Sequence, residues 1–267
     1  PALKALKRFV DYHRRANVTA DDTPRPDLPD GAAATMKAQL AGNGRSLSEH
    51  AAKAALRAYG LPMVGERLVM SEAEALTAAE EIGFPVVMKG LADGLEHKSD
   101  AGLVHLNLKD AGGARAAYGD LAEKLAGQTL NGQPAPCVVQ QMVTGGVEVI
   151  LGMQNDPDFG PMILVGVGGV MTELLDDVAL RRAPLSRRDV KDMIGETRLG
   201  MLLQGYRGAP RADRAALEDA ILRLSDLAVE HAQEIESIDI NPLLVLPEGE
   251  GCVAVDALIV KPEEATQ

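Results

Sequence analysis

The stretch Gly83–Val104, GFPVVMKGLADGLEHKSDAGLV, combines a strand pattern with a cluster of charged side chains. Phe84–Met88 is a short apolar run after a glycine, which predicts a buried strand, and Lys89 stands at its end. A polar loop with glycines then carries His97, before a second apolar run begins at Leu103. A lysine at a strand end opposite a loop with a histidine suggests phosphate handling. The alternative is a solvated hairpin tip.

Composition limits the class of protein. The chain has 267 residues, 46% of them hydrophobic, which is enough for one large or two small domains. A formal net charge of −12 argues against nucleic acid or an anionic membrane as the main partner. The two cysteines have no metal-site spacing, and no apolar run approaches membrane-spanning length. We therefore expect a reducing, cytoplasmic setting with no nucleic-acid or membrane partner.

The N-terminal part differs in composition from the rest. Leu3–Arg15 has the apolar spacing of a short amphipathic helix, and a segment rich in Pro and Asp follows it. We expect residues 1–16 to finish a preceding domain and residues 17–45 to form a linker. The main fold is then expected over residues 46–261, with residues 262–267 as a tail.

Capping signals and apolar runs alternate in the first half of the main fold. Ser46-x-x-Glu49 has the pattern of a capping box that opens a helix through Tyr59, and Ser71-x-x-Glu74 repeats it. The other elements predicted for this compact lobe are strands at 67–70, 84–89 and 103–108, and a helix from Asp110 to about Leu125.

Strands dominate the second half. CVVQQMV (137–143) and VEVILGM (147–153) are separated by Thr-Gly-Gly, which predicts a β-hairpin. The further predicted elements are a strand at 162–167, helices at 186–196, 199–204 and 213–232, and strands at 235–240, 243–246 and 252–260.

Three polar side chains interrupt the apolar C-terminal strands. Asp239 and Asn241 share one face by the two-residue period of a strand, and Asp256 lies on the strand that returns beside it. Carboxylate and amide oxygens suit Mg²⁺, which keeps positions open for substrate phosphates. Strand-end caps or ion pairs are the structural alternative, but unpaired acids are costly among apolar neighbours.

Other nucleotide-binding signatures are absent from the sequence. There is no GxxxxGK[ST], which excludes a P-loop NTPase, and no HRD and DFG pair, which excludes a typical protein kinase. The glycine cluster Gly166–Gly169 does not match GxGxxG.

Several motifs together resemble one family. LSEHAAKAALRAYGLP, IGFPVVMK, HKSDAGLV, VEVILGMQNDPDFGP, GVGGV, DVALRRAPL and DINPLLV…VAVDA occur in order over residues 46 to about 261. They resemble the ATP-grasp module of NDP-forming acyl-CoA synthetases, the group of the ADP-forming acetate–CoA ligases, related to the β subunit of succinyl-CoA synthetase. The resemblance implies an α+β fold whose two lobes hold ATP between them. The smaller lobe would span about residues 66–136, and the larger one residues 46–65 with 137–261.

The same resemblance implies roles for individual residues. His97 matches a histidine that is transiently phosphorylated, and Lys89 matches a lysine that contacts the nucleotide's phosphates. The segment that lines the adenine is matched by Gln141, Met142 and Val143, and an acid on the ribose is matched by Glu148. The magnesium ligands are matched by Asn241 and Asp256, with Asp239 as a lesser candidate. The implied cofactors are ATP/ADP and Mg²⁺.

The resemblance implies the nucleotide half of an enzyme that converts ATP, a carboxylic acid and CoA to ADP, phosphate and acyl-CoA. CoA-binding and CoA-ligase domains would be its partners, on the same polypeptide or an α subunit, in an oligomeric enzyme. A non-catalytic ATP- or acyl-CoA-sensing module of an acetyltransferase-like polypeptide is the alternative. Two departures from the family pattern, Leu103 and Leu258, stand where a glycine and a basic residue are common.

Overall fold

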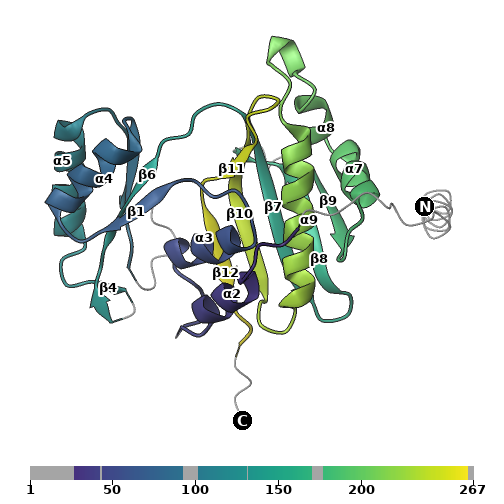
Figure 1. Ribbon diagram of the computed structural model, residues 1–267, viewed down its shortest axis with the longest axis horizontal. Helices are drawn as coiled ribbons and strands as arrows, with labels where there is room; N and C mark the ends of the chain where they lie inside the picture. Colours follow the sequence, from purple (N-terminus) through teal and green to yellow (C-terminus); the bar gives the residue numbers. More distant parts are fainter. Residues whose placement is uncertain (1–26, 43, 93–101, 131, 170–176, 264–267) are drawn as a thin grey trace.

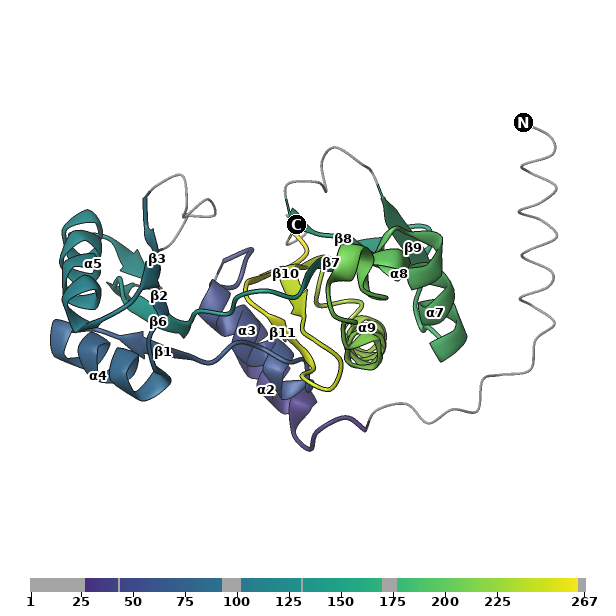
Figure 2. The same ribbon diagram turned by 90° about the horizontal axis from the view of Figure 1, so that it is seen from above.

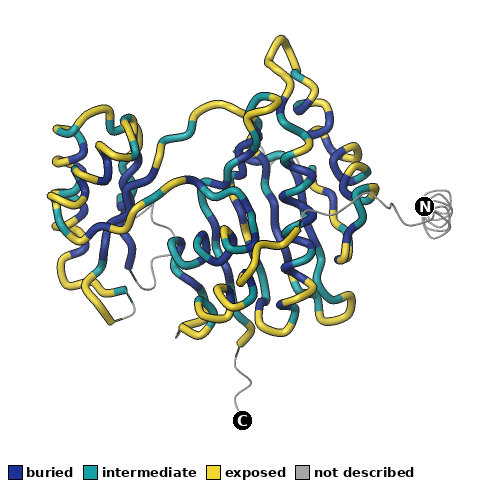
Figure 3. Tube along the Cα trace, in the orientation of Figure 1, coloured by how far each residue is buried: buried dark blue, intermediate teal, exposed yellow. Residues whose placement is uncertain are grey.

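The computed structural model describes residues 27–42, 44–92, 102–130, 132–169 and 177–263. Two lobes lie side by side, each with its own sheet and its own buried core (Figure 1, Figure 3). The smaller lobe holds the strands β1, β6, β2 and β3, and the larger lobe holds the six-stranded sheet. No helix among these residues is long and apolar enough to cross a membrane.

The small lobe is a four-stranded antiparallel sheet with two helices on one face. The strand order is β1-β6-β2-β3, with bounds Glu66–Val69, Cys137–Gln141, Val86–Gly90 and Val104–Leu108. Helices α4 (Glu72–Ile82) and α5 (Ala111–Lys124) cover the face turned away from the large lobe (Figure 2). A two-stranded hairpin follows α5, formed by β4 (Thr129–Leu130) and β5 (Gln133–Pro134).

Local sequence explains the helices of this lobe. Ser71 and Asp110 are the N-caps of α4 and α5, and their side chains accept hydrogen bonds from the amides of Glu74 and Gly113. Each cap satisfies an amide that has no partner within its helix. Gly83 ends α4 with a φ of 90°, a conformation that favours glycine. The predictions for these two helices are confirmed.

The two faces of β2 have different environments. Val86 and Met88 are fully buried in the small lobe's core under α4 and α5. Val87 and Lys89 alternate with them and therefore point toward the large lobe. The strand that the sequence predicts thus delivers its terminal lysine to the space between the lobes.

The large lobe is built on an antiparallel sheet whose strands run in the order β11-β10-β7-β8-β9, with β12 also paired to β10. Helices pack on one face and close a large apolar core (Figure 1). The strands are β7 (Val147–Asp156), β8 (Gly160–Val167), β9 (Val178–Arg182), β10 (Ser237–Val245), β11 (Cys252–Ala254) and β12 (Ala257–Val260). The helices are α2 (Ala32–Leu40), α3 (Glu49–Ala58), α7 (Arg187–Glu196), α8 (Leu199–Leu202) and α9 (Arg214–Glu230), with a short 3₁₀ turn at Tyr206–Gly208.

The predicted hairpin of residues 137–153 is wrong. β6 pairs with β1 and β2 in the small lobe, whereas β7 pairs with β10 and β8 in the large one. The segment between them connects the lobes (Figure 1). Gly146 lies close against β10 rather than in a tight turn. A Cβ at this position would be 2.8 Å from the Val245 carbonyl oxygen. The boundary expected at about residue 136 precedes β6, whereas β6 belongs to the small-lobe sheet.

Three smaller predictions need correction. The N-cap of α3 is Ser48, not Ser46, and it accepts from the amide of Ala51. β10 is one strand with a register shift between Ile240 and Leu243, not two strands. Part of the expected linker forms α2, which buries Met36 in the large-lobe core. Strand β9 was not predicted.

Candidate functional site

Lys89 lies at the junction of the lobes. Its side chain is 7% exposed, and the ammonium nitrogen is 2.6 Å from Glu49 Oε1 and 3.7 Å from Asp256 Oδ2. Burial alone would lower the pKa of Lys89, but the carboxylates of Glu49 and Asp256 outweigh it and raise the pKa above its ordinary value. The lysine is therefore a fixed cation at neutral pH.

Asp239, Asn241 and Asp256 come together at one corner of the large-lobe sheet. Asp239 and Asn241 are both exposed on the same face of β10, as the alternation predicts. Asp256 stands between β11 and β12, and its backbone carbonyl accepts a hydrogen bond of 3.3 Å from the amide of Asn241. Lys89 reaches this corner from the other lobe.

The charges at this corner fit a divalent cation. Partial desolvation and the nearby Asp256 carboxylate raise the pKa of Asp239 above its ordinary value, as expected for two acids that lie close together. A cation held by Asp256, Asn241 and Asp239 would relieve that repulsion, and oxygen ligands of this kind suit Mg²⁺. Among the described residues, no three His, Cys, Asp or Glu side chains are arranged so that they alone could hold a metal ion, so substrate oxygens would have to complete the coordination.

Gln141, Met142 and Val143 form the end of β6 and the start of the connection to the large lobe. The amide of Gln141 donates to the carbonyl of Gly65, and the amide of Met142 donates to that of Pro85. The Met142 sulfur also accepts a bond of 3.3 Å from the amide of Asn107. These bonds fix the segment at the junction of the lobes, with its side chains at least partly accessible.

Glu148 stands exposed on β7, on the face that carries the acidic corner. Its backbone carbonyl accepts from the amide of Gly168. Gly169 has a φ of 75°, and a Cβ at this position would lie 2.4 Å from Glu148 Oε2. Gly169 therefore leaves space for the Glu148 side chain, and Gly168 lies against the backbone of Glu148 and Val149, which explains the two glycines without a P-loop type of phosphate binding.

His97 lies outside the described residues. The structure therefore brings together Lys89, Asp239, Asn241 and Asp256, and places the segment 141–143 and Glu148 beside the same junction, without placing the histidine.

The sequence analysis missed four side chains that contact one another or Lys89 at this junction: Glu49, Lys53, Glu66 and Gln140. Glu49 looked like the second member of a capping box, whereas its side chain binds the ammonium groups of Lys53 and Lys89. A signal was available, because Lys53 follows Glu49 by four residues in the middle of an alanine-rich helix face. A charged residue at a position of that face where apolar residues are expected points to buried partners.

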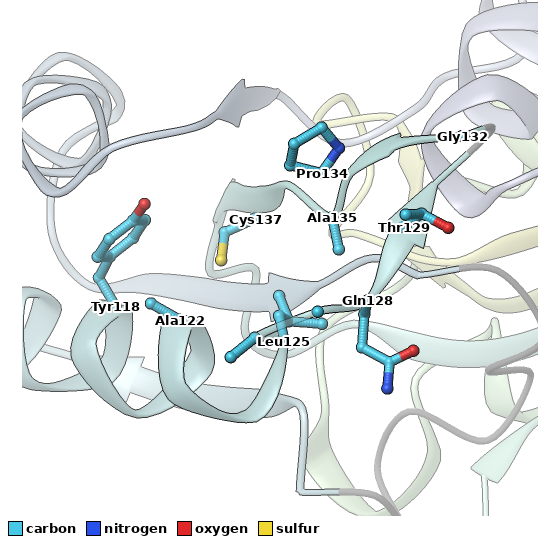
Figure 4. Close-up of a pocket in the computed structure, with 11 residues that line it drawn as sticks. Tyr118, Ala122, Leu125, Gln128, Thr129, Gly132, Pro134, Ala135 and Cys137 are labelled. Carbon is cyan, nitrogen blue, oxygen red and sulfur yellow. The ribbon is translucent and has the colours of Figure 1, made fainter.

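A separate cavity of about 430 Å³ lies in the small lobe, beside α5 and the β4–β5 hairpin (Figure 4). Cys137 lines it, together with Tyr118 and Leu125. Burial raises the pKa of the Cys137 thiol to about 11, so this thiol is protonated at neutral pH. Cys137 and Leu125 belong to the core under α4 and α5, so the cavity opens on the side of the sheet opposite Lys89.

Comparisons with known proteins identify the family of this chain. A model of the ATP-grasp domain matches residues 38–260. The chain is 38% identical over 221 residues to subunit β of acetate–CoA ligase (ADP-forming) II of Pyrococcus furiosus, which covers 83% of this chain and 94% of that subunit. The chain belongs to the ATP-grasp family of ADP-forming acyl-CoA ligases. The family and fold class predicted from the sequence are thereby confirmed.

Two further relatives show how much of their own length the match covers. The 4-hydroxybutyrate–CoA ligase (ADP-forming) of Nitrosopumilus maritimus is 38% identical over 214 residues, which are 80% of this chain but 30% of that protein. Acetyl-coenzyme A synthetase 1 of Ca. Korarchaeum cryptofilum, solved with coenzyme A and Mg-AMPPCP, matches with a TM-score of 0.71 and 38% identity over 82% of this chain and 93% of that one. Its phosphohistidine segment points towards the nucleotide binding site. The match thus covers 94% of a separate β subunit but 30% of a longer ligase.

Proposed function

We propose that this chain binds Mg–ATP between its lobes and supplies the phosphoryl group for an ADP-forming acyl-CoA synthetase. The observation that carries the proposal is the meeting of Lys89 with Asp256 at the junction of the lobes, 3.7 Å apart. A cation for phosphates and an oxygen site for a divalent metal are two of the parts that phosphoryl transfer needs from a protein.

Each residue of the site would have its own role in binding Mg–ATP. Lys89 would contact the phosphates as a point charge, and Asp256 with Asn241 and Asp239 would hold Mg²⁺, which offsets charge on the transferring oxygens. The segment Gln141–Val143 would line the adenine side, and Glu148 would contact the ribose. A solved relative that holds Mg-AMPPCP supports this arrangement.

His97 would accept the phosphoryl group. A ring nitrogen lone pair attacks the γ-phosphorus, the N–P bond forms, and ADP leaves with the electron pair of the broken P–O bond. In the complete enzyme the group then passes to the CoA-ligase part, where a carboxylic acid and CoA become acyl-CoA. CoA bound in the solved relatives supports such a partner.

The proposal is tested by phosphorylation with γ-labelled ATP and Mg²⁺, with the chain alone and with a CoA-ligase subunit of the family. The expected result is acid-labile label on the chain that disappears in His97→Ala. His105→Ala is the matched control, because His105 is close to His97 in the sequence and its ring is already bonded to Asp120 at 2.7 Å. Label that survives in His97→Ala would exclude His97 as the acceptor.

A chain that binds Mg–ATP without taking up label, alone or with its partner, would favour the sensing module over the enzyme. Failure to bind Mg–ATP at all would exclude both functions.

A further inference from the structure

Lys53 is a charged side chain in the interior of the molecule. It is 0% exposed, and its ammonium nitrogen lies 2.7 Å from Glu49 Oε1, 2.9 Å from Gln140 Oε1 and 3.2 Å from the carbonyl oxygen of Val255. These three bonds use all three hydrogens of the ammonium group. Glu66 Oε2 lies closer still, at 2.5 Å, and forms an ion pair with the same ammonium group.

Glu49 is shared by two lysines. Its Oε1 atom accepts from Lys53 at 2.7 Å and from Lys89 at 2.6 Å, and the residue is 5% exposed. A buried carboxylate next to Lys89 would by itself weaken the attraction of that lysine for an anionic ligand. Lys53 offsets part of the charge of Glu49 and holds its carboxylate in place, while the same ammonium group also pairs with Glu66.

The partners of this cluster come from both lobes. α3 carries Glu49 and Lys53, and its apolar residues pack in the large-lobe core. Glu66, Lys89 and Gln140 belong to three strands of the small-lobe sheet. The first turns of α3 therefore join the small lobe to the corner where Val255 and Asp256 stand.

The cluster also restricts a flexible side chain. A lysine ends in a point charge on a four-carbon stem, and fixing it during binding costs conformational entropy. The bond to Glu49 fixes the ammonium of Lys89 near Asp256 before any ligand arrives.

We propose that Glu49 is a positioning residue for Lys89, held in place by Lys53, and that it presents the lysine beside Asp256 for the phosphates of the nucleotide. The inference rests on the proposed nucleotide site. Glu49 touches neither substrate nor metal in this account and acts through Lys89.

The test is a double-mutant cycle on the affinity of the chain for Mg-AMPPCP, measured by calorimetric titration. Glu49→Gln keeps the size of the side chain and removes its charge. We expect it to weaken binding roughly tenfold or more, the scale of one charge-assisted hydrogen bond. The double variant Glu49→Gln with Lys89→Met should bind within about twofold of Lys89→Met alone, because residues that act together are not additive.

A matched control and a second variant keep the result interpretable. Glu218→Gln makes the same change at another buried glutamate, which pairs with Arg214 on α9 at 2.8 Å, and it should leave the affinity unchanged. If Glu49→Gln does not fold by circular dichroism, Glu49→Asp keeps the charge but withdraws it by one methylene. Glu49→Asp should still weaken nucleotide binding, and it should cause no further loss of affinity when Lys89 has already been replaced by Met.

Glu49 variants with unaltered affinity for Mg-AMPPCP would overturn the inference, although nucleotide binding by the parent chain would stand. A double variant whose loss of affinity is the product of the two single losses would overturn it in the same way. An unaltered affinity in Lys89→Met would overturn it as well, since Glu49 would have nothing to position. No binding by the parent chain would instead refute the proposed function.

Discussion

The ammonium of Lys89 and the carboxylate of Asp256 lie 3.7 Å apart although they come from different lobes. Lys89 ends a strand of the small sheet, and Asp256 stands between two short strands at the edge of the large one. Neither lobe alone holds both charges. Binding of phosphate and metal at this place therefore depends on the arrangement of the two lobes.

Replacement of Asp256 tests the metal corner. Asp256→Asn removes one of two carboxylates, so the site should attract a divalent cation less strongly. We expect the Mg²⁺ concentration that half-saturates nucleotide binding to rise on the order of tenfold. The measurement is a titration of Mg-AMPPCP binding against Mg²⁺.

Asp158→Asn is the control for this experiment, because Asp158 is an exposed acid on the turn between β7 and β8. It should leave the Mg²⁺ requirement unchanged. An equal response of the two variants would exclude Asp256 as a metal ligand.

Tyr59 and His231 form a buried hydrogen-bonded pair between the ends of α3 and α9. The Tyr59 hydroxyl is hydrogen-bonded to His231 Nε2 at 2.5 Å, and both side chains are almost fully buried. His231 Nδ1 is bonded in turn to Glu234. Tyr59→Phe leaves the imidazole nitrogen without this partner and should lower the free energy of unfolding by about 1–2 kcal/mol.

Urea denaturation measures this difference. Tyr206→Phe, at an exposed tyrosine, should stay close to the parent protein. A Tyr59→Phe variant as stable as the parent would show that the bond makes no net contribution.

Asp213 should make stability depend on pH. Its carboxylate caps α9 through the amide of Ala216 and accepts from the amides of Gly249 and Gly251. Partial burial alone would raise the pKa of Asp213, but the three backbone bonds outweigh it and hold the pKa below its ordinary value of 3.8. The stabilisation is therefore fully present above pH 3.8 and is lost as the pH falls through the lower, folded-state pKa.

The prediction compares Asp213→Asn with the parent, since asparagine still caps a helix but does not titrate in this range. Unfolding in urea should show a stability difference at neutral pH that shrinks on acidification below pH 3.8. A difference that stays constant over that range would contradict the role of the charge.

Features that depend on near neighbours in the sequence were predictable. Ser71 and Asp110 cap their helices as expected, because a cap needs only the three residues that follow it. The two-residue period of β10 correctly placed Asp239 and Asn241 on one face.

Pairing between distant strands was not predictable in the same way. Residues 137–153 have the sequence of a hairpin, yet β6 pairs with β1 and β2 of the small lobe and not with β7. The partners of a strand depend on the packing of the whole sheet. Glu49 was misread for a related reason. Its pattern fits a cap, and its partner Lys89 lies on a strand 40 residues further along the chain.

Affinity for Mg-AMPPCP in the parent chain and in Lys89→Met tests the central claim most directly. Titration calorimetry should show Mg²⁺-dependent binding of a single nucleotide per chain, weakened roughly tenfold or more by Lys89→Met because a charged contact to phosphate is lost. Absence of nucleotide binding, or equal affinity in the two proteins, would contradict the account.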